Sequence, residues 1–325
     1  MRPRLPIFTA ALVLVAWRPA LAQQNPPATG KLLPAPVAVK GPFTSLAATP
    51  GETLLKSAVA ELARMQTVAA KMRQQVNLFG HQIIGSGTYL QQGRGVDLRL
   101  RMELKLRVAE RLSSLQQVSD GKSFWVRSDG LDETRITRVD LARVRYALQR
   151  QQLDAPANVT AGISVGGLPR LLENLDASFR FGAATEERLD RLAVWKIEGE
   201  WERTKLADLL PAQAERLRAG NAPDFSKLPE HLPDRVRLML GKDDLFPYRF
   251  EFLRMSPEIN EATGRREAKV LVLMEFFEVQ TNVAIDARNF VYQPTKFEDA
   301  TGTFLRTLGL SEQAATAKAE AKVSR

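Results

Sequence analysis

The chain has 325 residues, 44% of them hydrophobic, and a formal net charge of +9, so it is long and apolar enough to bury a sizeable core. It contains no cysteine and only two histidines, His81 and His231, which excludes disulfides and thiolate metal sites. Its basic residues are interspersed with Asp and Glu, a pattern that does not favour nucleic-acid binding.

Residues 1–22 have the layout of a secretory signal peptide. Arg2 and Arg4 form a basic start, an apolar stretch of about ten residues follows, and Ala20-Leu21-Ala22 offers small side chains for cleavage before Gln23. Because a membrane span needs ~20 apolar residues, cleavage is favoured over a permanent anchor. We therefore expect a periplasmic or secreted protein. Loss of three arginines lowers its charge from +9 to +6, an excess that suits an anionic envelope surface.

The next segments divide the chain into a leader, a single domain and a tail. Residues 23–48 are rich in proline and predict a flexible leader, residues 49–310 a single domain, and residues 311–325 a disordered tail of Ala, Lys and Glu. Thr49-Pro50-Gly51-Glu52 resembles a capped helix start. The apolar spacing after it predicts an amphipathic helix over 52–74.

From Val76 onward the apolar residues recur at every second position. The clearest case runs from Val96 to Val108, where seven apolar side chains alternate with six charged ones, as in a long strand with one buried face. Asp120-Gly121 favours a tight hairpin turn. The pattern predicts strands near 76–85, 87–91, 96–109, 114–119, 123–128 and 133–138, followed by a helix over 141–152.

The second half starts with a loop over 154–166 that is rich in Ala, Asn and Gly. The apolar run Val270–Met274 predicts a central strand that is covered on both faces, and Pro211 should kink or split its helix. We expect helices over 168–175, 204–218 and 300–308, and strands near 178–181, 191–201, 235–240, 248–255, 267–280 and 290–293. About ten strands, mostly joined by hairpins, and a few amphipathic helices predict an α+β protein with one large antiparallel sheet and helices on one face.

Two short motifs resemble those of a known family. The hairpin 117–125 carries Asp120-Gly121 followed by Phe124-Trp125, and the stretch 297–304 places Asp299 and Thr301 before a short helix. Over residues 52–309 the chain is similar to LolA-like lipoprotein carriers (the LolA/LolB superfamily). The resemblance implies a half-barrel, a curved sheet with helices packed on its concave face. It also implies a lipid or an acylated protein as partner. An insertion over 154–210, the leader and the tail depart from the carriers themselves.

The remaining motifs give little support for catalysis. Gly162-Ile163-Ser164-Val165-Gly166 matches the G-x-S-x-G nucleophile elbow, but that motif requires a preceding strand in a mostly parallel sheet. We interpret it as a glycine-rich loop before a helix, and a hydrolase using Ser164 is the least favoured function. His81 and His231 lack the spacing of metal ligands. We expect a non-catalytic protein with no metal and no cofactor.

The large apolar residues of the predicted strands are the candidate ligand-binding residues. They are Leu98, Leu100, Met102, Leu104, Leu106, Trp125, Trp195, Phe250, Phe252, Met274 and Phe276. They would line either a lipid pocket or a closed core. In the first case the protein would be a lipid carrier or sensor at the cell envelope. In the second it would be an envelope scaffold or interaction protein that fills its own core.

Overall fold

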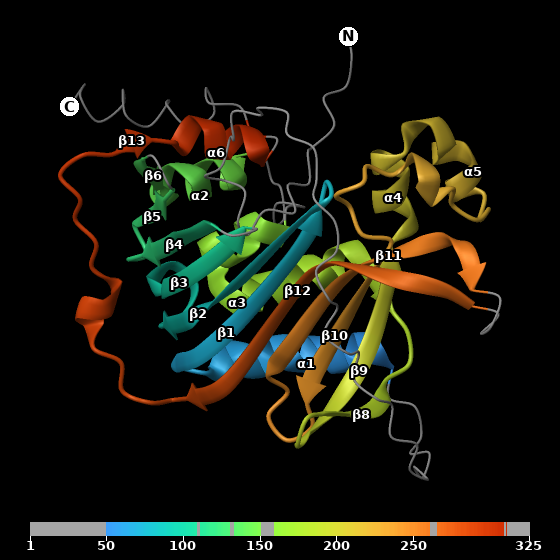
Figure 1. Cartoon of the computed structure of the whole chain (residues 1–325), viewed down its shortest axis with the longest axis horizontal. Helices are drawn as coiled ribbons and strands as arrows, with labels where there is room; N and C mark the ends of the chain where they lie inside the picture. Colours follow the sequence, from blue (N-terminus) through green and yellow to red (C-terminus); the bar gives the residue numbers. More distant parts are fainter. Residues whose placement is uncertain are drawn as a thin grey trace.

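A computed structural model of the chain describes residues 50–108, 111–130, 133–150, 159–260, 265–308 and 310, and these form one large sheet with helices on one face (Figure 1). The predicted signal peptide, leader and tail lie outside the described residues. The strands are β1 (Thr67–Leu78), β2 (His81–Gln92), β3 (Arg99–Val108), β4 (Arg111–Ser119), β5 (Ser123–Asp129), β6 (Thr134–Asp140), β7 (Phe179–Phe181), β8 (Thr185–Leu189), β9 (Leu192–Trp201), β10 (Arg235–Gly241), β11 (Pro247–Asn260), β12 (Arg265–Thr281) and β13 (Glu298–Asp299).

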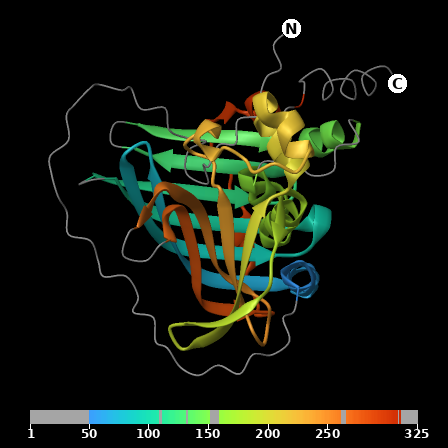
Figure 2. The same cartoon turned by 90° about the vertical axis from the view of Figure 1, so that its right-hand side faces the viewer.

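The strand order is β13-β6-β5-β4-β3-β2-β1-β12-β11-β10-β9-β7, and β8 pairs with β9. Every pairing is antiparallel except that of β13 with β6. β1 therefore joins the two halves of the sheet, because it pairs with β2 on one side and with β12 on the other. The sheet is strongly twisted. In the side view of Figure 2, β3–β5 run horizontally, whereas β9 and β10 run close to vertically.

The helices are α1 (Gly51–Arg64), α2 (Leu141–Arg150), α3 (Val159–Ser178), α4 (Arg203–Leu209), α5 (Ala214–Arg218) and α6 (Thr301–Thr307). α1 and α3 pack against each other behind the sheet in Figure 1. We call the face that they cover the inner face, and the opposite one the outer face. α2 and α6 lie together beside β5 and β6. α4 and α5, which follow β9 and precede β10 in the chain, form a separate pair at the upper right in Figure 1.

The predicted α+β class and the single large antiparallel sheet with helices on one face are confirmed. The sheet has 13 strands rather than about ten, and two of them, β8 and the two-residue β13, were not predicted. The Asp120-Gly121 hairpin joins β4 and β5 as expected, with Gly121 at a φ of 86°. Pro211 divides its helix, since it begins the 3-10 turn between α4 and α5.

Several predicted elements are wrong in extent. The helix predicted over 52–74 ends at Arg64, because Met65 is extended and β1 begins at Thr67. The strand predicted near 96–109 starts only at Arg99, since residues 95–97 form a 3-10 turn that leaves Val96 64% exposed. The strands predicted near 76–85 and 87–91 have the wrong bounds, because the chain turns at Phe79-Gly80 and β2 continues through both of its glycines, Gly85 and Gly87.

Two further corrections concern segments outside the sheet's centre. Residues 159–166 belong to α3 rather than to a loop, and α3 is kinked at Gly167, where φ is 64° and ψ is −158°. Residues 290–293 do not form a strand. They belong to a segment of residues 282–297, which we call the outer strap, that runs from β12 to β13 along the outer face (Figure 1).

Candidate functional site

The inner face of the sheet is mostly apolar because the strand register aligns its inward side chains. One row of cross-strand neighbours crosses seven strands, from β3 to β9. Its members in order are Leu106, Gly85, Gln74, Met274, Phe250, Leu238 and Ile197. Leu104, Gly87, Met72 and Phe276 form a neighbouring row over β3, β2, β1 and β12. Aligned inward residues of this kind form the floor of either a core or a pocket.

The structure brings most of the predicted lining residues together on this face. Leu100, Met102, Leu104, Phe250, Met274 and Phe276 are buried to 2% exposure or less, and Leu98 and Leu106 are buried as well. Trp195 and Phe252 also point inward by register but are only partly buried against the core. The ring of Trp195 lies 4.7 Å from Nζ of Lys242.

Trp125 is the correction to the predicted set, since it lies on the outer face. Its cross-strand neighbours are Val118 and Arg138, and Val118 in turn pairs with Arg101 on the outer face. Its ring packs at right angles to Phe297 of the outer strap, with ring centres 4.9 Å apart, and also contacts Tyr292. The inward positions of β5 are held instead by Phe124 and Val126.

Helices α1 and α3 cover the inner face with leucines. Leu55 and Leu62 of α1 are fully or almost fully buried. The second half of α3, after the kink at Gly167, contributes four leucines that have no exposed surface: Leu168, Leu171, Leu172 and Leu175. The side chains of the inner face are therefore closed off by the protein's own helices in this conformation.

Polar side chains also occur on the inner face, and the predicted set did not include them. Oε1 of Gln91 accepts hydrogen bonds from the Tyr89 hydroxyl at 2.7 Å and from the backbone N–H of Leu168 at 3.2 Å. Burial raises the pKa of the Tyr89 hydroxyl, so this group stays a neutral donor. The sequence signal for Gln91 was its position two residues after Tyr89 in a predicted strand, which places both side chains on the same face.

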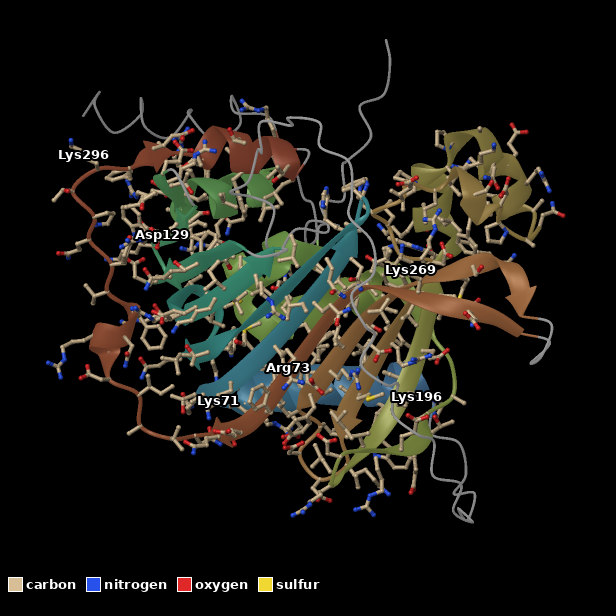
Figure 3. The ribbon with its side chains drawn as sticks, viewed as in Figure 1. Lys71, Arg73, Asp129, Lys196, Lys269 and Lys296 are labelled. Atoms are coloured by element: carbon tan, nitrogen blue, oxygen red, sulfur yellow. The ribbon has the colours of Figure 1, made fainter. Side chains whose placement is uncertain are left out.

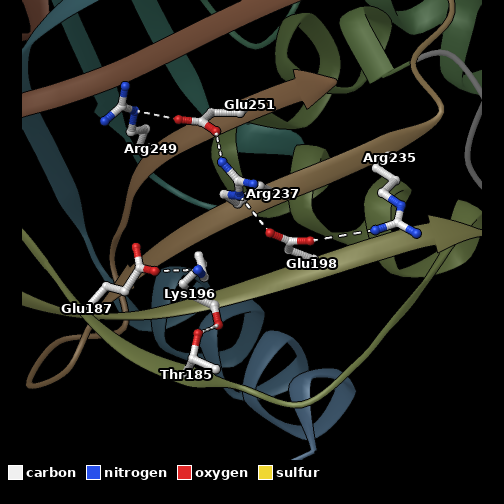
Figure 4. Close-up of polar contacts among 8 residues, drawn as sticks. All are labelled: Thr185, Glu187, Lys196, Glu198, Arg235, Arg237, Arg249 and Glu251. Carbon is white, nitrogen blue, oxygen red and sulfur yellow. Dashed lines mark hydrogen bonds and ion pairs between the residues drawn. The ribbon is translucent and has the colours of Figure 1, made fainter. Parts of the chain in front are cut away.

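The outer face is charged. Lys71 and Arg73 of β1 extend toward the viewer in Figure 3, away from α1. Across β9, β10 and β11, arginine and glutamate alternate in a connected series, drawn in Figure 4. Arg237 bridges Glu198 and Glu251 at 2.9 and 2.8 Å, Arg249 pairs with Glu251 at 3.0 Å, and Arg235 lies 4.0 Å from Glu198.

Ser164, His81 and His231, the residues examined for catalysis or metal binding, do not form a site together. Ser164 lies within α3, not at a strand-to-helix turn, so the geometry of a nucleophile elbow is not formed. His81 begins β2, and His231 lies before β10 with its ring 6.3 Å from that of Phe79. Among the described residues, no three His, Cys, Asp or Glu side chains gather as metal ligands would. Within the same residues, no helix has the length and apolar character needed to cross a membrane.

No family model and no curated protein matches the chain. Among solved structures, it is similar to an outer membrane lipoprotein-sorting protein domain from Vibrio parahaemolyticus, with 9% identity, a TM-score of 0.31, and coverage of 74% of this chain and 95% of that one. It is also similar to a LolA superfamily protein from Nitrosomonas europaea, with 11% identity, a TM-score of 0.29, and coverage of 75% and 98%.

A third similar structure is the MucA/MucB complex of Pseudomonas aeruginosa, with 11% identity and a TM-score of 0.34. The match covers 75% of this chain and 61% of that one. The predicted resemblance to LolA-like proteins stays a prediction, because TM-scores of 0.29–0.34 and identities of 9–11% carry no conclusion about the family, ligand or activity of this chain.

Proposed function

We propose that this exported protein binds one hydrophobic ligand of the acyl-chain type between the inner face and helices α1 and α3, without catalysis. The observation that carries the proposal is the inner face itself. It is apolar across strands from β3 to β9, and it is covered by helices rather than by a second sheet. Helices joined to a sheet by their ends can shift without breaking strand pairing, so such a face can admit a guest.

The free energies of burying a lipid chain and of exposing the helix leucines indicate that α3 moves along the inner face rather than detaching from it. A sixteen-carbon chain buries about fourteen methylenes, which stabilises the complex by ~11 kcal/mol. Full exposure of the four buried leucines of α3 would cost about 6–12 kcal/mol. Because these two quantities are similar, a chain that expelled α3 would gain almost nothing. Binding is favourable only if α3 keeps most of its packing and slides along the ligand.

The direct experiment is solvent extraction of the purified mature protein followed by mass spectrometry of the extract. We expect one long-chain lipid per protein molecule. A matched pair of substitutions on β1 tests its location, because Ala70 points inward and Ala69 points outward. Ala70→Leu should fill the inner space and lower the bound lipid several-fold, whereas Ala69→Leu should not change it. Equal lipid content in both variants, or none in the native protein, contradicts the proposal.

A second function follows from the burial of the inner face in the absence of a guest. Side chains such as Leu100 and Phe250 have no exposed surface, which is what a self-filled core requires. The protein would then act as an envelope scaffold or interaction protein, with the charged outer face and the leader making contacts. A pull-down of envelope proteins with and without residues 23–48 tests this alternative. Capture that depends on the leader, together with an empty lipid extract, would favour it.

A further inference from the structure

Gln74 is the one polar residue in the row that crosses the inner face from β3 to β9. Its cross-strand neighbours are Gly85 on β2 and Met274 on β12. Its side chain is 1% exposed, and neither its Nε2 nor its Oε1 has a hydrogen-bond partner. The row is apolar on both sides of it, with Leu106 toward one edge and Phe250 toward the other.

An unpaired amide at this position is unfavourable for the unliganded protein, because a buried donor or acceptor without a partner costs the full loss of its hydration. Its neighbours cannot compensate, since glycine has no side chain and the methionine sulfur is only a weak acceptor. The same face does pair a buried glutamine elsewhere, because Gln91 receives two hydrogen bonds. Gln74 therefore differs from Gln91 in having both atoms available to another molecule.

We propose that Gln74 hydrogen-bonds the linking group of the bound lipid, and that this lipid carries a secondary amide with apolar chains on both sides. The inference rests on the proposed lipid-binding function and specifies its ligand class. A primary amide side chain offers a donor and an acceptor. A secondary amide offers an acceptor and a donor, so both atoms of Gln74 would be satisfied. An ester offers only acceptors, so Oε1 would remain unpaired.

The apolar surroundings of Gln74 determine where the linking group lies in the ligand. Leu106 continues the row on one side, and Phe250, Leu238 and Ile197 continue it on the other. A ligand whose only polar group is a charged terminal head could bind this face through its chain, but it could not pair that head with Gln74 without burying the charge in the apolar row. A ligand with the amide inside the chain places only methylenes against these residues.

The test compares two probes of equal length, N-octyldecanamide and octyl decanoate, as competitors of a fluorescent fatty acid bound to the mature protein. Their affinity ratio is measured in the native protein and in Gln74→Met, so that differences in aqueous solubility cancel. We expect the amide-to-ester ratio to fall about tenfold in Gln74→Met, as loss of one buried hydrogen bond predicts. Gln75→Met makes the same exchange at the neighbouring glutamine of β1, which points to the outer face, and it should leave the ratio unchanged.

A thermal melt of each variant verifies folding, and Gln74→Leu replaces Gln74→Met if the latter does not fold. If both probes bind and the ratio is the same in all variants, the role of Gln74 is wrong while the lipid-binding function stands. The same holds if Gln75→Met changes the ratio as much as Gln74→Met does. If neither probe displaces the fluorescent fatty acid and the fatty acid itself does not bind, the proposed function fails, and this inference fails with it.

Discussion

The Oε1 atom of Gln91 on β2 accepts a hydrogen bond from the backbone N–H of Leu168, the first residue after the kink of α3. The same atom accepts the Tyr89 hydroxyl. This pair of contacts links α3 to the inner face by a directional bond, whereas the leucines that follow pack by shape alone. The hydrogen bond therefore adds a directional constraint on the position of α3 to the packing of its leucines.

Gln91→Leu should destabilise the protein by about 2–4 kcal/mol, because it leaves the N–H of Leu168 and the Tyr89 hydroxyl buried without an acceptor. Adding Tyr89→Phe removes one of these unpaired groups and should recover about 1 kcal/mol. Urea unfolding of the single and double variants measures both effects. Strictly additive losses from Gln91→Leu and Tyr89→Phe would show that the two side chains do not act through this bond.

Gly167→Ala should destabilise the protein by about 3 kcal/mol. The left-handed backbone at φ 64° disfavours any Cβ, and this Cβ would lie 2.3 Å from Oε1 of Gln91. Gly95 is the matched control, since it also has a positive φ but no heavy atom within 4 Å of an added Cβ. Gly95→Ala should cost only about 1 kcal/mol. Equal losses of the melting temperature would mean that the contact with Gln91 does not restrict the kink.

The recurrence of apolar side chains at every second position predicted most strands, because a strand that is buried on one face alternates apolar and polar residues. It failed at the start of β1, where two periods overlap. Met72 fits the helical series that begins at Leu55, but it also fits the alternating series Val68, Ala70, Met72. Pairing along all of β1 with both β2 and β12 outweighs the helical propensity of this segment. Such long-range pairing cannot be read from a local window.

The inner face was predictable, but the faces of individual aromatic residues were not. Leu100, Met102 and Leu104 point inward because their strand alternates without a break. In β5, four successive residues are buried, so alternation does not distinguish the two faces. Trp125 is buried on the outer face because Tyr292 and Phe297 of the outer strap, which follow it by 167 and 172 residues in the chain, pack against its ring.

Trp125→Leu should destabilise the protein by about 2–3 kcal/mol, because the ring loses its contacts with Phe297 and Tyr292. Since it lies on the outer face, the change should leave the affinity for the fluorescent fatty acid unaltered. Phe250→Leu on the inner face should be similarly destabilising but should also change that affinity. An effect of Trp125→Leu on the affinity as large as that of Phe250→Leu would contradict the assignment of the two faces.

Arg254 holds the segment before β10 through four backbone carbonyls. Its guanidinium donates to the oxygens of Phe225, Leu228, Pro229 and Leu232 at 2.8–3.1 Å. Lysine cannot reproduce this fork of donors, so Arg254→Lys should cost about 2–4 kcal/mol in urea unfolding. Arg288→Lys, at a side chain that is 89% exposed, should change stability by less than about 0.5 kcal/mol. Similar values for both would show that the carbonyl contacts of Arg254 contribute little.

Asp234, beside Arg254, gives the stability a pH dependence. Burial raises the pKa of this carboxyl, although the N–H of Met255 and the charges of Arg254 and Arg235 act in the opposite direction. A raised folded-state pKa means that the folded protein holds the proton more tightly than the unfolded chain does. The stability that protonated Asp234 contributes is therefore fully present below the unfolded-state pKa of about 3.9. It is lost as the pH rises through the pKa of Asp234 in the folded state.

Asp234→Asn removes this titration while its side-chain oxygen can still accept the hydrogen bond from Met255. The native protein should therefore lose stability relative to Asp234→Asn as the pH rises from 3.5 to 7. Urea unfolding of both proteins at half-unit pH steps measures this difference, and the other titrating groups cancel because both proteins share them. A difference that is constant with pH, or that grows in favour of the native protein as the pH rises, would mean that the contact with Arg254 dominates the burial of Asp234.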